Sequence, residues 1–268
     1  MSTFKQFLRA LKDCLGGKNL RQAHESDPRL KQSPMREGFG VGLINSEQIS
    51  AYANALPTGL DDAKRQEGLT NWWGATDRES ALETLGGLAY GNHTRIYAAA
   101  LDQFLGRTPG TTAGPSENWR TGGLPPPIAE GAELAATQWA QEPPHERIAQ
   151  TVDQIQRAYR ELGDEKHGQY RPADYERGVA AWDLGRLVTV SRMCADQGLI
   201  GAAERDGIVA WAGASTAEQF ATWDEVAVSY LIGRACLFGW DPSWRGLAAI
   251  AAQILDDAAS PWTIPLRR

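Results

Sequence analysis

The sequence lacks any apolar run approaching the roughly 20 residues that a membrane-spanning helix needs. Its first residues interleave charged and apolar side chains, without the uninterrupted apolar stretch or cleavage pattern of a secretory signal. It has only three cysteines, Cys14, Cys194 and Cys236, which are far apart and show no Cys-x-x-Cys spacing. An odd number of scattered thiols suits a reducing compartment. We therefore expect free thiols, a cytoplasmic location and no integral membrane association.

Local motifs for catalysis or metal binding are also missing. The sequence has no P-loop and no Gly-x-Ser-x-Gly elbow, and its four histidines are scattered. His145 and Glu146 begin like a metalloprotease helix, but Ala149 stands where the second ligand is required. We expect no metal and no cofactor. A catalytic triad assembled from distant residues would leave no such local pattern.

Positive charge is scarce overall and concentrated near the start. The net charge is −6, so the chain has no global basic field to attract a phosphate backbone, and we expect no nucleic-acid partner. Residues 1–37 nevertheless carry a net charge of +4, and apolar residues there follow helical spacing from Phe4 to Leu15. We predict a basic amphipathic helix docked on its own domain. The alternative is peripheral contact with an anionic membrane through residues 1–37.

Strand patterns are absent too, while apolar residues recur with helical periodicity. We therefore predict an all-α protein, an irregular multi-helix bundle with two central buried helices, at about 173–196 and 216–238. At 268 residues the chain can bury about 70–75% of its unfolded surface without disulfides. Further helices are expected at about 46–56, 76–88, 93–105, 145–162, 202–213 and 243–257.

Glycine and proline divide the chain into four segments. We expect a basic helix and an irregular connector over 1–45, in which Gly38–Gly42 forms a turn. Residues 46–105 are expected to form a helical segment that packs on the main body at 129–268. Residues 106–128 form a Gly/Pro-rich loop or linker, with a flexible linker favoured over a surface loop, because so many glycines and prolines preclude a helix or strand.

The predicted helix 173–196 carries charges where a surface helix would have none. Projected at 100° per residue, Asp183 and Arg186 lie within an apolar stripe, and the opposite side is apolar as well. The helix 216–238 is similar, with Arg234 projected among aromatic and small residues. We therefore expect these three charged side chains to be buried.

Both helices also have a glycine directly before the arginine, at Gly185 and Gly233. Glycine costs a helix interior about 1 kcal/mol relative to alanine, so two such sites predict a tight helix crossing. Buried guanidinium groups need acceptors, which Asp183, Asp224 or Glu225 can supply. We predict an Asp/Arg network beside an aromatic cluster; a role in fixing helix register is favoured over ligand binding. Its members are Trp182, Asp183, Arg186, Trp223, Asp224, Tyr230 and Arg234.

Three landmarks occur in order along the chain: Trp73–Glu79, Ala181–Arg186, and Phe220–Glu225 with Tyr230–Arg234. In this order they resemble the bacterial family of domain of unknown function 1266, over roughly residues 70–240. Leu199, after Gly198, departs mildly from the Gly-aromatic step that is frequent in that family. The resemblance implies a bacterial, intracellular, helical protein and brings no activity with it.

Two functions of different classes fit the sequence. We favour a protein-binding adaptor, for example an immunity or toxin-associated protein, because no catalytic motif is present. Trp119 and Arg120, in the Gly/Pro-rich segment, are candidate partner-binding residues, since both types are enriched in interaction hot spots. The alternative is an enzyme in which Arg186 and Arg234 hold an anionic substrate and Asp183 or Asp224 acts as general base.

Overall fold

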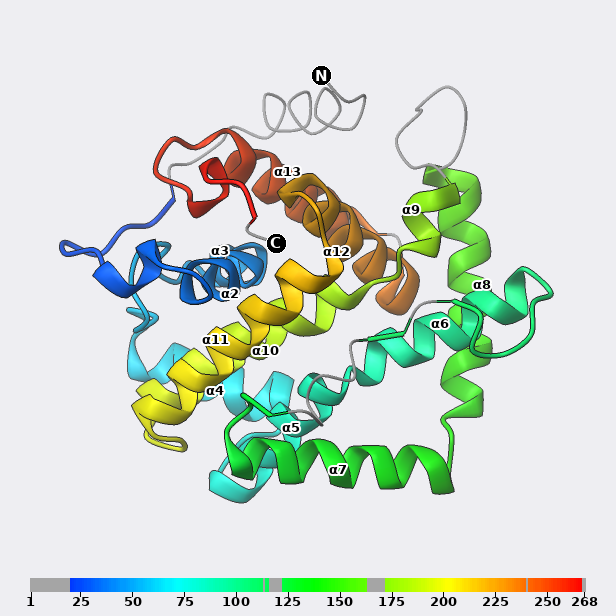
Figure 1. The fold of residues 1–268 in the computed structure, drawn as a ribbon, viewed down its shortest axis with the longest axis horizontal. Coiled ribbons are helices and arrows are strands. Elements are labelled where there is room, and N and C mark those ends of the chain that lie inside the picture. The colour runs from blue at the N-terminus through cyan, green and yellow to red at the C-terminus, as the bar shows by residue number, and fades with distance from the viewer. Residues whose placement is uncertain (1–19, 113, 116–121, 163–171, 240, 267–268) are drawn as a thin grey trace.

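The structure, a computed structural model, describes residues 20–112, 114–115, 122–162, 172–239 and 241–266. These residues contain helices, turns and loops but no strand, so the predicted all-α class is confirmed (Figure 1). In the part of the chain described, no helix combines the length and the apolar character needed to cross a membrane. The α-helices are, in chain order, α2 (Met35–Val41), α3 (Leu43–Gln48), α4 (Asp62–Trp73), α5 (Arg78–Tyr90), α6 (Asn92–Phe104), α7 (Pro126–Gln141), α8 (His145–Leu162), α9 (Pro172–Glu176), α10 (Ala180–Asp196), α11 (Ala202–Gln219), α12 (Trp223–Phe238) and α13 (Pro242–Asp256).

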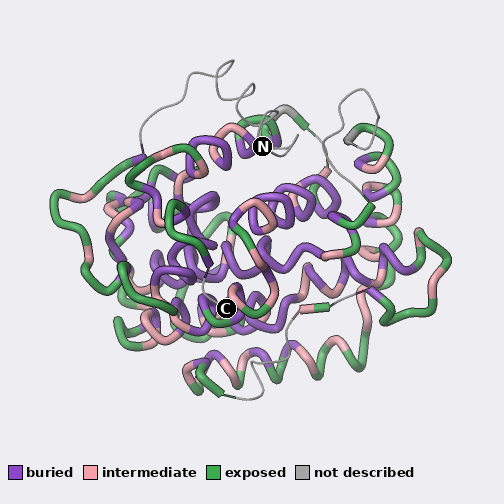
Figure 2. Tube along the Cα trace, turned by 45° about the horizontal axis from the view of Figure 1, so that its top comes forward, coloured by how far each residue is buried: buried purple, intermediate pink, exposed green. Residues whose placement is uncertain are grey.

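The core is centred on α10 and α12, which are buried along most of their length, whereas exposed residues gather on the outer loops and helices (Figure 2). The two helices approach closely at the two glycines. A Cβ atom at Gly233 would lie 2.7 Å from the Cβ of Trp182, and one at Gly185 would lie 3.1 Å from the Tyr230 ring. The glycines thus permit the tight crossing that the sequence predicts.

Of the irregular connector expected up to residue 45, the described residues 20–34 contain only the short 3-10 helix Pro28–Lys31, but the turn expected at Gly38–Gly42 is wrong. These glycines belong to α2 and to its junction with α3. A Cβ at Gly38 would lie only 1.7 Å from the carbonyl oxygen of Val209, so α2 presses backbone to backbone on α11. Glycine serves helix packing here, although the same residues are common in turns.

Several helix boundaries differ from the predicted ones. The helix expected at 46–56 is wrong, because Ser46 lies inside α3, which ends at Gln48. The helix expected to begin at about residue 76 is α5, whose N-cap is Asp77; the Asp77 carboxylate accepts a hydrogen bond from the Ser80 amide at 2.9 Å. Gly178, at φ 85°, separates α9 from α10, so the helix predicted at 173–196 is two helices. Likewise 216–238 is divided, because α11 runs to Gln219 and α12 begins only at Trp223.

The Gly/Pro-rich segment is tied to the body at its first part. Asp102 of α6 accepts hydrogen bonds from the amides of Gly110, Thr111 and Thr112 at 2.8 to 3.0 Å. Beyond it, α7 lies along the bottom of Figure 1 and packs against α5, so the segment 46–105 shares the core with the rest of the chain. The predicted helix within residues 1–37 falls largely on residues 1–19, outside the described residues.

The end of the described chain returns to α2. The indole nitrogen of Trp262 donates a hydrogen bond to the carbonyl of Gly40 at 2.9 Å, and its ring stacks on Trp223 at 5.1 Å. The cysteines of the core, Cys194 and Cys236, are free and buried, as expected; Cys14 lies outside the described residues.

Candidate functional site

A cavity of about 330 Å³ lies where α3, α4, α10 and α12 meet. This volume is within the range of small-molecule sites. One face of α10 lines the cavity. Its lining residues follow each other at steps of three and four residues, which places them on the same side of the helix: Trp182, Arg186, Thr189 and Met193. The complete lining is Asn45, Gln48, Ile49, Trp72, Trp73, Trp182, Arg186, Thr189, Met193, Arg234 and Phe238.

The guanidinium of Arg186 is surrounded by aromatic rings. Its central carbon lies 4.7 Å from the ring centroid of Trp73, 4.8 Å from that of Trp182 and 5.6 Å from that of Phe238. One terminal nitrogen lies 3.3 and 3.4 Å from the two ring nitrogens of His93. Nε2 of His93 can accept a hydrogen bond from Arg186, because Nδ1 lies 2.9 Å from the Asp183 carboxylate. The cation–π contacts with the three aromatic rings stabilise the charge without a carboxylate in ion-pair range.

No carboxylate of the described residues lies within ion-pair distance of Arg186, although Asp183 is near enough to favour its charge. Burial lowers the pKa of the Arg186 guanidinium, and the attraction of Asp183 opposes that shift. The group remains a cation at neutral pH, because arginine starts from so high a pKa. The cavity therefore contains a positive charge whose donors are not saturated by protein acceptors.

One further donor belongs to the lining of the cavity and is buried without a partner in the described residues: the indole nitrogen of Trp182, a side chain that is 6% exposed. Tyr230 is fully buried against Trp182 and does not line the cavity. Burial raises the pKa of Tyr230, against the charge of Arg186, a hydrogen bond with Asn45 and the charge of Arg234, so the phenol keeps its proton at neutral pH. A buried donor without a partner is uncommon, since it costs about 1–3 kcal/mol. The Trp182 indole therefore points to an occupant of the cavity.

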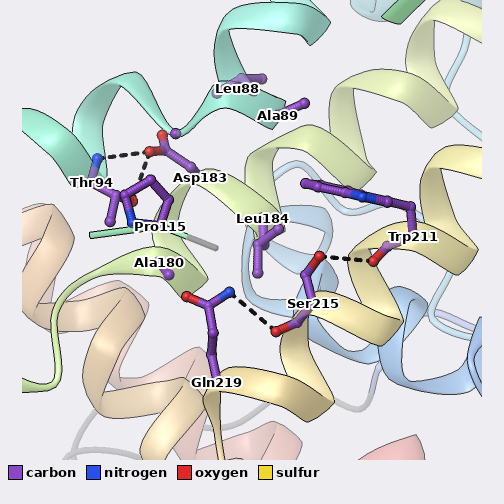
Figure 3. Close-up of a pocket in the computed structure, with 11 residues that line it drawn as sticks. Leu88, Ala89, Thr94, Pro115, Ala180, Asp183, Leu184, Trp211, Ser215 and Gln219 are labelled. Carbon is purple, nitrogen blue, oxygen red and sulfur yellow. Dashed lines mark hydrogen bonds between the residues drawn. The ribbon is translucent and has the colours of Figure 1, made fainter. Parts of the chain in front are cut away.

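Asp183 is buried on the side of α10 where α6 packs. Its carboxylate accepts a hydrogen bond from Nδ1 of His93 at 2.9 Å. It also accepts hydrogen bonds from the amide and hydroxyl of Thr94 at 2.8 and 2.9 Å, which Figure 3 shows. Burial raises the pKa of Asp183, but His93, Arg186 and the Thr94 amide outweigh it, and the pKa lies below its usual value. An ionised carboxylate only accepts hydrogen bonds, so Nδ1 of His93 carries the proton.

Replacing Asp183 by asparagine should change the tautomer of His93. The asparagine amide can present its oxygen to Thr94 only by presenting NH₂ to His93, whose Nδ1 must then accept. We expect the Nε2-protonated form at pH 8, read from imidazole ¹⁵N shifts, and a loss of about 1–3 kcal/mol in unfolding free energy. Asp102→Asn, which alters another buried carboxylate, is the control and should leave His93 unchanged. The same tautomer in Asp183→Asn and wild type would contradict this assignment.

The other predicted site residues are divided between two places. Tyr230 packs edge-on against Trp182 at 4.9 Å, and Arg234, which lines the cavity, is paired with Asp241 at 2.8 Å. Trp223 does not join this cluster. It stacks on Trp262, because seven residues of helix place it about 10 Å along the axis from Tyr230.

The expected network of Arg186 and Arg234 with Asp183, Asp224 or Glu225 also takes a different form. Arg234 uses Asp241, Glu225 lies 3.4 Å from Arg177, and Asp224 lies in the first turn of α12. Between Asp183 and Arg186, His93 contacts both side chains. A general-base role does not suit Asp183, because its lowered pKa makes it a weak base and its oxygens are already occupied.

Sequence reasoning missed two important side chains. His93 was treated as one of four scattered histidines, because its partner Asp183 is 90 residues away. Arg192 is completely buried and donates to the carbonyls of Tyr52, Ala55 and Leu56 at 2.8 to 2.9 Å. The usable signal for Arg192 was its position between Val190 and Cys194, both buried apolar residues of the same helix.

Two other sequence expectations concern metals and partners. Among the described residues, no three His, Cys, Asp or Glu side chains are grouped as a metal would require. The partner-binding candidates Trp119 and Arg120 lie outside the described residues, so that hypothesis stays a prediction.

Comparison with known proteins agrees with the landmarks along the chain. No curated protein and no solved structure matches it. A family model described as a protein of unknown function, DUF1266, matches residues 68–266, which include α5 to α13 and all the cavity residues except those of α3 and the segment after it. Since the match covers well over half of the sequence, this chain belongs to the DUF1266 family.

Proposed function

We propose that this protein binds a small anionic molecule in the cavity between α3, α4, α10 and α12. The observation that supports it most strongly is Arg186, a cation that lines the cavity without a carboxylate of the described residues in ion-pair range. An anion there would accept charge-assisted hydrogen bonds from the guanidinium, which are stronger than hydrogen bonds between neutral groups.

The remaining polar groups favour the same occupant. The indole N–H of Trp182, which has no partner in the described residues, is a donor from which an anion can accept a hydrogen bond. Among the described residues, no aspartate or glutamate lines the cavity to repel a negative charge. A cationic ligand would instead meet two arginines.

Replacing Arg186 by glutamine should weaken anion binding about tenfold or more, because the charge-assisted hydrogen bonds are lost while a polar side chain remains. The probe is inorganic phosphate, titrated at constant ionic strength. The measurement is the ¹⁵N–¹H resonance of the Trp182 indole, assigned with Trp182→Phe, which should shift as the anion binds.

The matched control is Arg245→Gln, which removes the same charge from an exposed position on α13. It should bind phosphate like the wild type. The proposal fails if phosphate leaves the Trp182 resonance unchanged, or if Arg186→Gln and Arg245→Gln bind it equally well. The adaptor function suggested by the sequence would be tested separately, through the residues outside the described part of the chain.

A further inference from the structure

The walls of the cavity above the arginine are largely aromatic. Trp72, Trp73, Trp182 and Phe238 line it, whereas Ile49 and Met193 are its only aliphatic or thioether side chains among the described residues. Aromatic side chains interact with flat rings by stacking or edge-on contact, beyond the gain from burying their surface. A bare inorganic anion would make no stacking or edge-on contact with these aromatic side chains.

The polar and apolar groups are also at different depths. Trp182, which offers the partnerless donor, is 6% exposed, and Asn45 is 9% exposed. Trp72 and Phe238, by contrast, are 62% and 45% exposed. Large apolar side chains this open to water on a ligand-sized cavity are typical of a binding site. An occupant would therefore meet donors at the floor and aromatic surface at the rim.

We propose that the ligand is an anion carried on a flat ring, such as an aryl phosphate or an aromatic carboxylate. This proposal rests on the anion-binding function stated above and specifies the rest of the molecule. The acidic group contacts Arg186 at the floor, and the ring lies against Trp72 and Phe238 at the rim. A cavity of about 330 Å³ is at the lower end of small-molecule sites, which favours one or two rings over a larger ligand.

The test compares three probes that share one acidic group: inorganic phosphate, phenyl phosphate and cyclohexyl phosphate. Phenyl phosphate should bind at least about tenfold more tightly than inorganic phosphate, because its ring covers the aromatic rim. It should also bind several-fold more tightly than cyclohexyl phosphate, which has a ring of the same carbon number that is not flat. Affinities are measured by calorimetry and by the Trp182 indole resonance.

Two variants locate the ring. Phe238→Leu and Trp72→Leu keep an apolar side chain but remove the aromatic face, so each should reduce the preference for phenyl over cyclohexyl phosphate. Trp72→Leu should leave the affinity for inorganic phosphate unchanged. Phe238→Leu also removes a ring from beside Arg186, so for this variant only the ratio of phenyl to cyclohexyl phosphate affinity is compared. Leu134→Ala, at a half-exposed site on α7 that does not line the cavity, is the control and should change nothing.

The outcomes separate the two proposals. Phosphate could bind through Arg186 while phenyl phosphate binds no more tightly than phosphate or cyclohexyl phosphate. This result would overturn the proposal that the ligand carries a flat ring and would leave the anion-binding proposal intact. If Phe238→Leu and Trp72→Leu both leave the phenyl preference intact, the ring does not occupy the rim and the proposal is overturned. If none of the three probes binds, both proposals fail.

Discussion

Replacing Gly38 by alanine is expected to lower the unfolding free energy by about 3 kcal/mol, the upper part of the range for overpacked cores. The added Cβ would lie 1.7 Å from the Val209 carbonyl oxygen and 2.9 Å from the Gly213 amide nitrogen. Both neighbours are backbone atoms of α11, so no side-chain rotation relieves the clash. The helices α2 and α11 must move apart, which opens the core. Urea unfolding followed by circular dichroism measures the effect.

Gly246 supplies a control at which the same substitution should raise the unfolding free energy instead of lowering it. It lies on an exposed face of α13, where a Cβ would meet no atom within 4 Å. Gly246→Ala should therefore raise the unfolding free energy by about 0.5–1 kcal/mol through helix propensity alone. Equal stability of Gly38→Ala and the wild type would show that α2 does not approach α11 as closely as described.

Replacing Arg192 by methionine should cost at least about 3 kcal/mol, because several buried acceptors lose their donor together. Its guanidinium donates to the carbonyls of Tyr52, Ala55, Leu56 and Pro57 at 2.8 to 3.3 Å. It also donates to the Ser46 hydroxyl at 2.7 Å. Methionine fills much of the same volume but offers no hydrogen. Besides lower stability, we expect faster proteolysis within residues 49–61, the loop that this arginine holds.

Two comparisons distinguish the loss of hydrogen bonds from the loss of charge. Arg192→Lys keeps the charge but has one nitrogen, which cannot reach acceptors on several sides, so it should be nearly as unstable as Arg192→Met. Arg245→Met, at an exposed position, should stay within about 0.5 kcal/mol of the wild type. A stable Arg192→Met with an unchanged cleavage pattern would refute the role assigned to this side chain.

The elements that sequence reasoning placed well are those with strong local signals. The helix expected at 145–162 is α8, because its apolar and charged residues alternate with helical period. The central position of α10 was evident because both of its sides are apolar. The close approach at Gly185 and Gly233 followed from the cost of glycine within a helix.

The elements it missed depend on contacts between distant segments. The sequence predicts no helix at α4 or α7, and its Gly/Pro-rich composition places the prolines that begin α7 in a loop. Proline is tolerated in the first turn of a helix, and Gly131 of α7 lies against Gly86 of α5, where small size rather than flexibility is required.

The candidate site was foreseen only in part. Trp182, Arg186 and Arg234 line the cavity because their spacing placed them on inward faces, which a helical projection detects. The pairing of Asp183 with His93 was not accessible, since it joins α10 to α6 across 90 residues. The spacing of charges within one helix does not show which other helix supplies the partner.

The contact between Trp262 and Gly40 bears on where this family's folding unit begins. The family match starts at residue 68, yet α2 and α3 precede it, press on α10 and α11, and provide Asn45 and Gln48 to the cavity. A truncated protein starting at residue 68 would expose the surfaces of α10 and α11 that α2 and α3 cover, and would deprive Trp262 of its acceptor. Residues 68–266, which the family model matches, thus form the larger part of this fold, and α2 and α3 complete it.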